Sequence, residues 1–286
     1  MRFCLNAFCA SRKENMIPNI LSIAGSDPSG GAGIQADLKT FAALGCYGMA
    51  AITALTAQNT RGVRGLHLPP PEFVGAQIDA IFEDIEVAAV KIGMLGSAAI
   101  VETVAARLAA HGPRAVVLDP VLAATSGDPL AASGVEQAMI ERLFPLAALV
   151  TPNLDEAARL SGLPRARDAA EMRAAAERLH RLGARAVLIT GGDSGGHSSD
   201  DLYFDGASER IFSAPRVATR NTHGTGCTLS SAIAAYLGLG FALPEAIGAA
   251  KAYLTRALEA ADELSVGGRH GPLNHFFELW RPTSKA

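Results

Sequence analysis

The fold of this chain is constrained most strongly by an alternation of short apolar segments with longer segments of helical periodicity. Short apolar segments are typical of strands buried on both faces of a sheet, and the intervening helices connect such strands in parallel. The predicted strands are residues 19–24, 49–53, 63–67, 88–92, 115–118, 148–150 and 186–190. The predicted helices are residues 34–44, 71–82, 97–111, 133–143, 154–161, 168–182, 226–237 and 244–261. We therefore expect an α/β fold with a mostly parallel central sheet.

The domain organisation follows from the continuity of this pattern. Residues 201–204 and 210–213 flank an Asp-Gly turn sequence, which predicts an antiparallel hairpin. No internal repeat or low-complexity linker divides the 286 residues, so we expect a single domain over residues 17–286. Residues 1–16 lack the pattern, and their apolar patch is short for a signal peptide. We interpret them as a disordered extension.

Composition argues against several classes of function. The formal net charge is −3, which disfavours a general nucleic-acid binder. No apolar run reaches the roughly 18 residues that a membrane span needs. The 4 cysteines form no C-x-x-C pair, so neither a disulfide framework nor a zinc site is expected, and this usage is typical of a reducing compartment. We expect a cytoplasmic protein that has no nucleic-acid and no membrane partner.

The segment over residues 221–230 carries the strongest chemical signal. Its Gly224-Thr225-Gly226 turn leads into a predicted helix, so several backbone N–H groups should point the same way at the positive end of the helix dipole. Such a turn favours a phosphate. Cys227 follows in the first helical turn, where a helix N-terminus is expected to lower the pKa of a thiol. The alternative is that Cys227 is a small buried apolar side chain.

Small and polar residues also follow the other predicted strands. Ligands of parallel α/β sheets bind beyond the carboxyl ends of the strands, which meet at one edge. The residues at those ends are 25–27, 93–94, 119–120, 151–153 and 190–192. This clustering predicts one continuous active-site rim.

A glycine-rich loop over residues 25–33 raises the possibility of a dinucleotide site, because residues 31–36 fit the pattern G-x-G-x-x-A. Two features oppose this interpretation. The matching glycines do not directly follow the strand, and residues 41–62 contain no Asp or Glu where a ribose-binding acid should fall. The pattern G-x-x-x-x-G-K-[ST] is absent from the sequence as well. A dehydrogenase and a P-loop kinase are therefore disfavoured.

Six motifs together make the chain resemble the hydroxymethylpyrimidine/phosphomethylpyrimidine kinases of the ribokinase-like superfamily. They are residues 24–37, 53–60, 91–95, 126–130, 151–157 and 221–229, and the resemblance covers residues 17 to about 277. It implies a three-layer α/β/α sandwich and a homodimer. The implied activity is ATP-dependent phosphorylation of 4-amino-5-hydroxymethyl-2-methylpyrimidine, and then of its monophosphate, in thiamine diphosphate biosynthesis. ATP and Mg²⁺ are the implied cofactors.

The resemblance also implies roles for individual residues. For catalysis these are Cys227, as the group that receives the substrate's proton, and Gly224, Thr225 and Gly226. For substrate binding they are Gly25, Asp27, Ala32, Asp37, Gln58 and Met94. For nucleotide binding they are Asn153, Thr190 and Gly192, and for the metal they are Asp119, Asn153 and Glu156.

Physical arguments support some of these roles and leave alternatives to others. The amide of Gln58 matches the edge of an aminopyrimidine, which has a ring nitrogen and an amino group. Asp37 is predicted to bond the substrate's hydroxymethyl group, and the alternative is a solvated acid in the first helical turn. The resemblance places Met94 against the pyrimidine ring of the substrate, and the alternative is that Met94 packs in the core. Asn153 and Glu156 share a helix face and either hold the metal–phosphate network, which we favour, or form a capping box.

The chain lacks two lysines that are common in the family. Thr125 and Thr190 stand where the family commonly has lysine, and the loss of a cation should weaken the binding of an anion. Arg220 is a candidate for compensation. Two rival functions remain: a pyridoxal or pyridoxine kinase, and a non-catalytic pyrimidine-binding sensor of the same fold.

Overall fold

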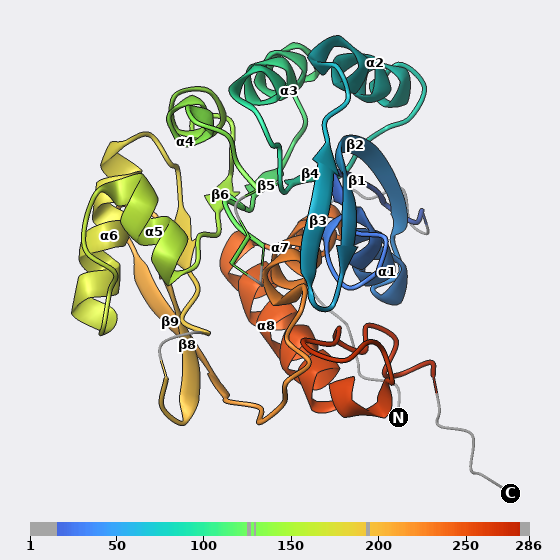
Figure 1. Ribbon diagram of the computed structural model, residues 1–286. Coiled ribbons are helices and arrows are strands. Elements are labelled where there is room, and N and C mark those ends of the chain that lie inside the picture. The colour runs from blue at the N-terminus through green and yellow to red at the C-terminus, as the bar shows by residue number, and fades with distance from the viewer. Residues whose placement is uncertain (1–15, 125–126, 129, 193–194, 281–286) are drawn as a thin grey trace, which may run out of the picture.

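The computed structural model describes residues 16–124, 127–128, 130–192 and 195–280 (Figure 1). Its strands are β1 (Asn19–Ser26), β2 (Tyr47–Asn59), β3 (Gly62–His67), β4 (Ala89–Ile92), β5 (Val116–Leu118), β6 (Leu149–Val150), β7 (Val187–Ile189), β8 (Ser198–Phe204) and β9 (Glu209–Pro215). They form one sheet in the order β3-β2-β1-β4-β5-β6-β7-β8-β9. The predicted extension, apart from its last residue, and Thr125 lie outside the described residues.

The middle of this sheet is parallel and its two ends are antiparallel. Every neighbouring pair from β2 to β7 is parallel. β3 pairs antiparallel with β2, and β8 and β9 form the predicted hairpin beside β7. Because parallel strands run in the same direction, the carboxyl ends of the central strands all meet at one edge of the sheet.

Helices cover both faces of the sheet (Figure 1). They are α1 (Gly33–Ala43), α2 (Pro71–Phe82), α3 (Ala98–His111), α4 (Val135–Ala138), α5 (Leu154–Ser161), α6 (Ala169–Arg181), α7 (Thr225–Gly238) and α8 (Leu243–Glu259). One apolar cluster lies under α1, α7 and α8, around Phe41 and Ile233. The other lies under α2 to α6, around Val104 and Leu179. The expected three-layer α/β/α sandwich with a mostly parallel sheet is therefore confirmed.

Helix ends show why the chain folds as its sequence indicates. The hydroxyl oxygen of Ser97 accepts a hydrogen bond from the Ile100 N–H at the start of α3, and the Asp168 carboxylate does the same for Glu171 at the start of α6. These contacts satisfy backbone donors that have no partner within the helix. α3 ends at Gly112, where φ is 60°, a left-handed conformation that glycine adopts at little cost.

Two elements differ from the prediction. β2 continues to Asn59 instead of ending at Thr53, because its outer half pairs with β3 and lies at the end of the sheet, where alternate residues are exposed and the apolar signal fades. The segment predicted as one helix over residues 133–143 is α4 followed by a π-helical turn over Met139–Leu143. Within the described part of the chain, no helix combines the length and apolarity required to cross a membrane.

Candidate active site

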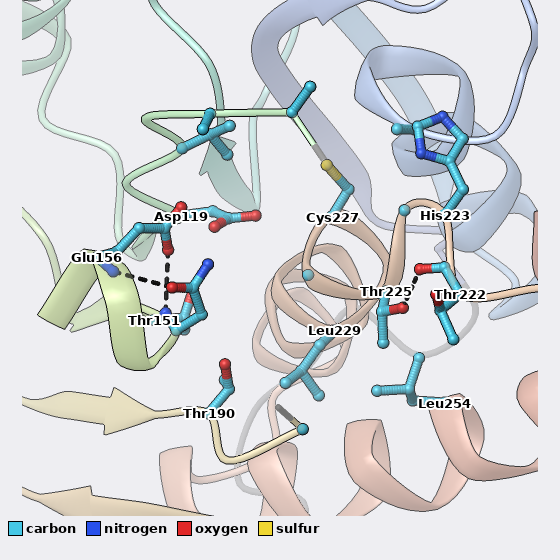
Figure 2. Close-up of a pocket in the computed structure, with 18 of the residues that line it drawn as sticks. Asp119, Thr151, Glu156, Thr190, Thr222, His223, Thr225, Cys227, Leu229 and Leu254 are labelled. Carbon is cyan, nitrogen blue, oxygen red and sulfur yellow. Dashed lines mark hydrogen bonds between the residues drawn. The ribbon is translucent and has the colours of Figure 1, made fainter. Parts of the chain in front are cut away.

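A cavity of about 810 Å³ lies where the parallel strands end, as the predicted rim requires (Figure 2). All of the predicted site residues except Asp37 line it. Those that do are Gly25, Asp27, Ala32, Gln58, Met94, Asp119, Asn153, Glu156, Thr190, Gly192, Gly224, Thr225, Gly226 and Cys227. The fold thus brings together residues from segments that are far apart in the sequence.

The glycine turn forms the N-terminus of α7. Gly224 has φ of 85°, and a Cβ atom on it would lie 1.9 Å from the carbonyl oxygen of Gly31. Only glycine fits this position. The Thr225 hydroxyl donates to the carbonyl oxygen of Thr222, which closes the turn (Figure 2). Cys227 follows at the cavity wall.

The Cys227 thiol does not have the lowered pKa that its position predicts. Burial raises its pKa to about 12, and Asp37 and Asp119 also raise it, while Lys91 and the Gly33 N–H lower it by less. The prediction from the helix N-terminus is wrong here because burial among carboxylates outweighs the helix dipole. The thiol is therefore protonated at neutral pH in the ligand-free protein.

Near Cys227, Lys91 and Asp37 form an ion pair that is fully buried from solvent. Lys91 Nζ lies 2.9 Å and 3.0 Å from the two Asp37 carboxylate oxygens, and both side chains are 0% exposed. The hydroxyl groups of Ser22 and Ser231 also donate to Asp37. Asp37 is thus not the solvated acid of the alternative hypothesis, and its predicted bond to the substrate stays a prediction.

Sequence reasoning missed Lys91, although it left a signal. A lysine in the middle of an otherwise apolar strand, β4, must have a buried partner. Burial lowers the Lys91 pKa, but attraction to Asp37, Cys227 and Asp119 outweighs this and raises it overall. The cavity therefore has a permanent cation beside the cysteine.

On the other side of the cavity lie two buried acids, Asp119 after β5 and Glu156 in α5 (Figure 2). Glu156 also completes a capping box: the Asn153 side-chain oxygen accepts from the Glu156 N–H at 2.9 Å, and Glu156 accepts from the Asn153 N–H at 3.0 Å. The capping alternative is therefore present in the structure. It does not compete with a ligand role, because one carboxylate oxygen of Glu156 suffices for the cap.

The chemistry of this acid pair fits a hard cation. Burial raises the Glu156 pKa to about 8, and repulsion from Asp119 adds to this. Burial also raises the Asp119 pKa. Two buried carboxyl groups that repel each other are stabilised by a divalent cation with oxygen ligands, such as Mg²⁺. Across the residues described, however, no cluster of three or more His, Cys, Asp or Glu side chains is arranged as a complete metal site.

Gln58 and Met94, two of the residues predicted to bind the substrate, lie at one end of the cavity. A Cβ atom on Gly25 would lie 2.9 Å from the Met94 sulfur, so the glycine leaves the space that the methionine occupies. Met94 is 7% exposed and packs against Ala54 and Leu130, so it lines the cavity and belongs to the core at once. The Gln58 side-chain oxygen lies 3.2 Å from the Thr56 hydroxyl.

Thr190 and Gly192 line the opposite end, where two unpredicted basic residues are found. Lys251 of α8 pairs with the buried Asp201 at 2.7 Å and lines the cavity. Arg216 donates to the backbone carbonyl oxygens of residues 192, 195, 196 and 198. Arg220, the residue considered as compensation for the missing lysines, is not among the lining residues.

The three-layer fold, with its cavity at the ends of the parallel strands, is that of the small-molecule kinases of ribokinase-like fold. The chain belongs to the phosphomethylpyrimidine kinase family, whose model matches residues 27–274. Both expectations, the fold and the family, are confirmed.

Three similar proteins illustrate this membership. The hydroxymethylpyrimidine/phosphomethylpyrimidine kinase of Rhizobium meliloti (strain 1021) is 54% identical over 91% of this chain and 98% of its own length. The thiamine biosynthesis bifunctional protein of Geobacter sulfurreducens is 54% identical over 90% of this chain, which spans 52% of that protein. Bacillus subtilis pyridoxal kinase, solved as an ADP complex, has a TM-score of 0.83 and 37% identity over 91% of this chain and 98% of its own.

Proposed function

We propose that the protein uses ATP to phosphorylate the hydroxymethyl group of 4-amino-5-hydroxymethyl-2-methylpyrimidine, and then the resulting monophosphate, in thiamine diphosphate biosynthesis. The observation that carries the proposal is one cavity lined by the Cys227 turn, the Asp119–Glu156 pair and Gln58. The activities for which the relatives are named support the substrate and the pathway.

The proposed mechanism rests on positioning. The turn over Gly224, Thr225 and Gly226 holds the transferring phosphoryl group, chiefly through the N–H groups of the two glycines, because the Thr225 N–H already donates to the Thr222 carbonyl oxygen. Lys91 supplies a fixed positive charge nearby. In this step the Cys227 thiol first loses its own proton to solvent. The thiolate then accepts the proton of the attacking hydroxyl group, as the hydroxyl oxygen bonds to the γ-phosphorus and the bond to the departing ADP breaks. Because the transition state of phosphoryl transfer is loose, alignment of the hydroxyl contributes more than the strength of the base.

The nucleotide and its metal belong to the other side of the cavity. Asn153, Thr190 and Gly192 contact the nucleotide, and Asp119, Asn153 and Glu156 hold Mg²⁺ directly or through water. A bound Mg²⁺ would supply positive charge to the nucleotide phosphates. Asp119 would then no longer present an uncompensated charge, one of those that raise the Cys227 pKa.

Substrate selection is assigned to Gln58, Met94, Gly25, Ala32, Asp27 and Asp37. The Gln58 amide offers donors and an acceptor to an aminopyrimidine. The rival function is pyridoxal kinase, which the Bacillus subtilis structure favours. An aminopyrimidine and a pyridine with a phenolic oxygen present different groups to this amide, so Gln58 should discriminate between them.

One assay separates the hypotheses. ATP consumption is measured with the pyrimidine alcohol, with its monophosphate and with pyridoxal, for the wild type and for Gln58→Leu. We expect the wild type to prefer the two pyrimidines, and Gln58→Leu to lose roughly 10- to 100-fold in kcat/KM for them. A preference for pyridoxal would overturn the substrate assignment, and no turnover of any of the three would favour the sensor.

The remaining proposals concern the whole molecule: one domain over residues 17–286, a homodimer and a cytoplasmic location. The exposed apolar side chains of Leu55 and Leu66, on the paired strands β2 and β3, support a subunit contact. Sedimentation equilibrium tests the dimer, and a monomer at micromolar concentration would contradict it.

A further inference from the structure

Asp27 is bonded to its own loop on both carboxylate oxygens. Oδ1 accepts hydrogen bonds from the N–H and the hydroxyl of Ser29, at 2.9 Å and 2.7 Å. Oδ2 accepts from the N–H of Gly31 at 3.2 Å and from the N–H of Ala32 at 2.9 Å. Asp27 is 2% exposed. A carboxylate with so many protein donors fixes the path of the chain from residue 27 to the start of α1.

The remaining partner of Asp27 comes from the cysteine turn. His223 Nε2 lies 2.8 Å from Asp27 Oδ2, although the two residues are 196 positions apart in the sequence. The contact is enclosed, because the side chains of His223 and Asp27 are 6% and 3% exposed. This hydrogen bond therefore joins the two glycine-rich segments of the site.

The backbones of these segments approach each other where the pair forms. A Cβ atom on Gly31 would lie 2.4 Å from the His223 ring, and one on Gly224 would meet the Gly31 carbonyl oxygen. The turn that precedes Cys227 therefore lies against a loop that Asp27 fixes, and His223 is the side chain that joins the two.

We propose that Asp27 and His223 are positioning residues, which hold residues 27–33 against the Gly224 turn and so align Cys227 with the anion turn. This inference rests on the proposed role of Cys227 in phosphoryl transfer. It gives Asp27, which the family resemblance implies as a substrate residue, a different task within the same site.

The charge state of Asp27 agrees with this task. Burial alone would raise its pKa, but hydrogen bonds from His223 and Ser29 outweigh burial and lower the pKa to about 2. Asp27 is therefore ionised at every pH at which the enzyme would work, and it accepts hydrogen bonds without competing for a proton.

The test compares variants that remove or retain the His223 donor. His223→Leu removes it, whereas His223→Gln retains a side-chain N–H of similar reach. We expect His223→Leu to lower kcat roughly 10- to 100-fold, the effect of losing a charge-assisted hydrogen bond, with the KM for ATP changed less than about threefold. His223→Gln should recover most of kcat. Asp27→Asn should lower kcat similarly, and the double variant with His223→Leu should be little worse than either single one.

Hydrogen exchange tests the same idea without relying on turnover. The amide protons of residues 31–33 should exchange at least about tenfold faster in His223→Leu than in the wild type, because their acceptors lose a fixed position. His111→Leu is the matched control: it removes another His–Asp pair, with Asp79 at 2.8 Å, that lies away from the cavity. Its kcat and the exchange of residues 31–33 should not change.

Three results would overturn the inference: unchanged exchange of residues 31–33 in His223→Leu, a His223→Gln variant as slow as His223→Leu, or additive losses in the double variant. A failure of the proposed function looks different. In that case the wild type phosphorylates no pyrimidine alcohol, yet the exchange measurement still decides whether the pair positions residues 31–33.

Discussion

The buried Lys91–Asp37 pair gives the sharpest prediction of stability. Lys91→Met keeps most of the side-chain volume and removes the charge, which leaves Asp37 with the two serine hydroxyl groups as side-chain donors. An ionised carboxylate without a counter-charge at 0% exposure is strongly unfavourable. The variant must either retain this charge or protonate Asp37, and both options lower the free energy of unfolding.

The expected magnitude follows from the burial of both partners. Removing one member of a buried ion pair typically costs about 3–5 kcal/mol. For a chain of this size, that loss lowers Tm by roughly 6–20 °C. The Lys91 pKa is raised in the folded protein, so the pair's contribution is complete below the unfolded pKa of lysine and is lost only as the pH rises through the folded value. The loss should therefore be constant across neutral pH.

Urea denaturation of Lys91→Met and the wild type measures this difference. The control is Arg114→Met, which breaks an exposed ion pair with Glu86, where the side chains are 85% and 77% exposed. It should change stability by less than about 1 kcal/mol. Lys91→Met combined with Asp37→Asn should recover much of the loss, because no buried charge remains. If Lys91→Met alone is as stable as Arg114→Met, the reasoning about the buried charge is refuted.

Three further predictions concern the catalytic edge. Cys227→Ala should lower kcat by roughly 100-fold or more while ADP binding, measured by calorimetry, is retained; wild-type turnover would exclude the proton-accepting role. Because the Glu156 pKa rises from 4.5 unfolded to about 8 folded, its contribution to stability should fall as pH increases between these values. Glu156→Gln should remove that slope in denaturation curves, and an unchanged slope would assign it to other groups. Gly224→Ala should lower the free energy of unfolding by at least about 2 kcal/mol and abolish activity. The control is Gly45→Ala, at φ of 76° with no atom within 4 Å of the new Cβ, which should lower stability less. Equal losses of stability would show that the contact between residue 224 and Gly31 is unimportant.

The sequence predicts the layers of the fold well because they depend on local periodicity. The helix over Pro71–Phe82 begins and ends where its proline and apolar pattern indicate. The outer half of β2 is harder to predict, because it is stabilised by pairing with β3 and not by burial of its side chains, so it lacks an apolar pattern. The π-helical turn at Met139–Leu143 has no signal in residue type that separates it from an α-helix.

For the site, chain order predicts which residues meet but not how they are charged. The rim from Gly25 to Cys227 follows from the rule that ligands bind at the carboxyl ends of parallel strands. The Cys227 pKa is raised by burial, Asp37 and Asp119 and is lowered by Lys91, and only the folded chain brings these three residues to the cysteine. Likewise, the partner of Asp27 lies in another motif, and no spacing rule links the two.

The separation of Asp27 and His223 by 196 residues also has a consequence for biosynthesis. At the usual translation rate of roughly 5–20 residues per second, the ribosome needs about 10–40 seconds to advance from one to the other. Until then Asp27 lacks its His223 partner, and Cys227 has not been made. The central parallel strands are available to fold during that interval, so the site is completed after them, late in synthesis.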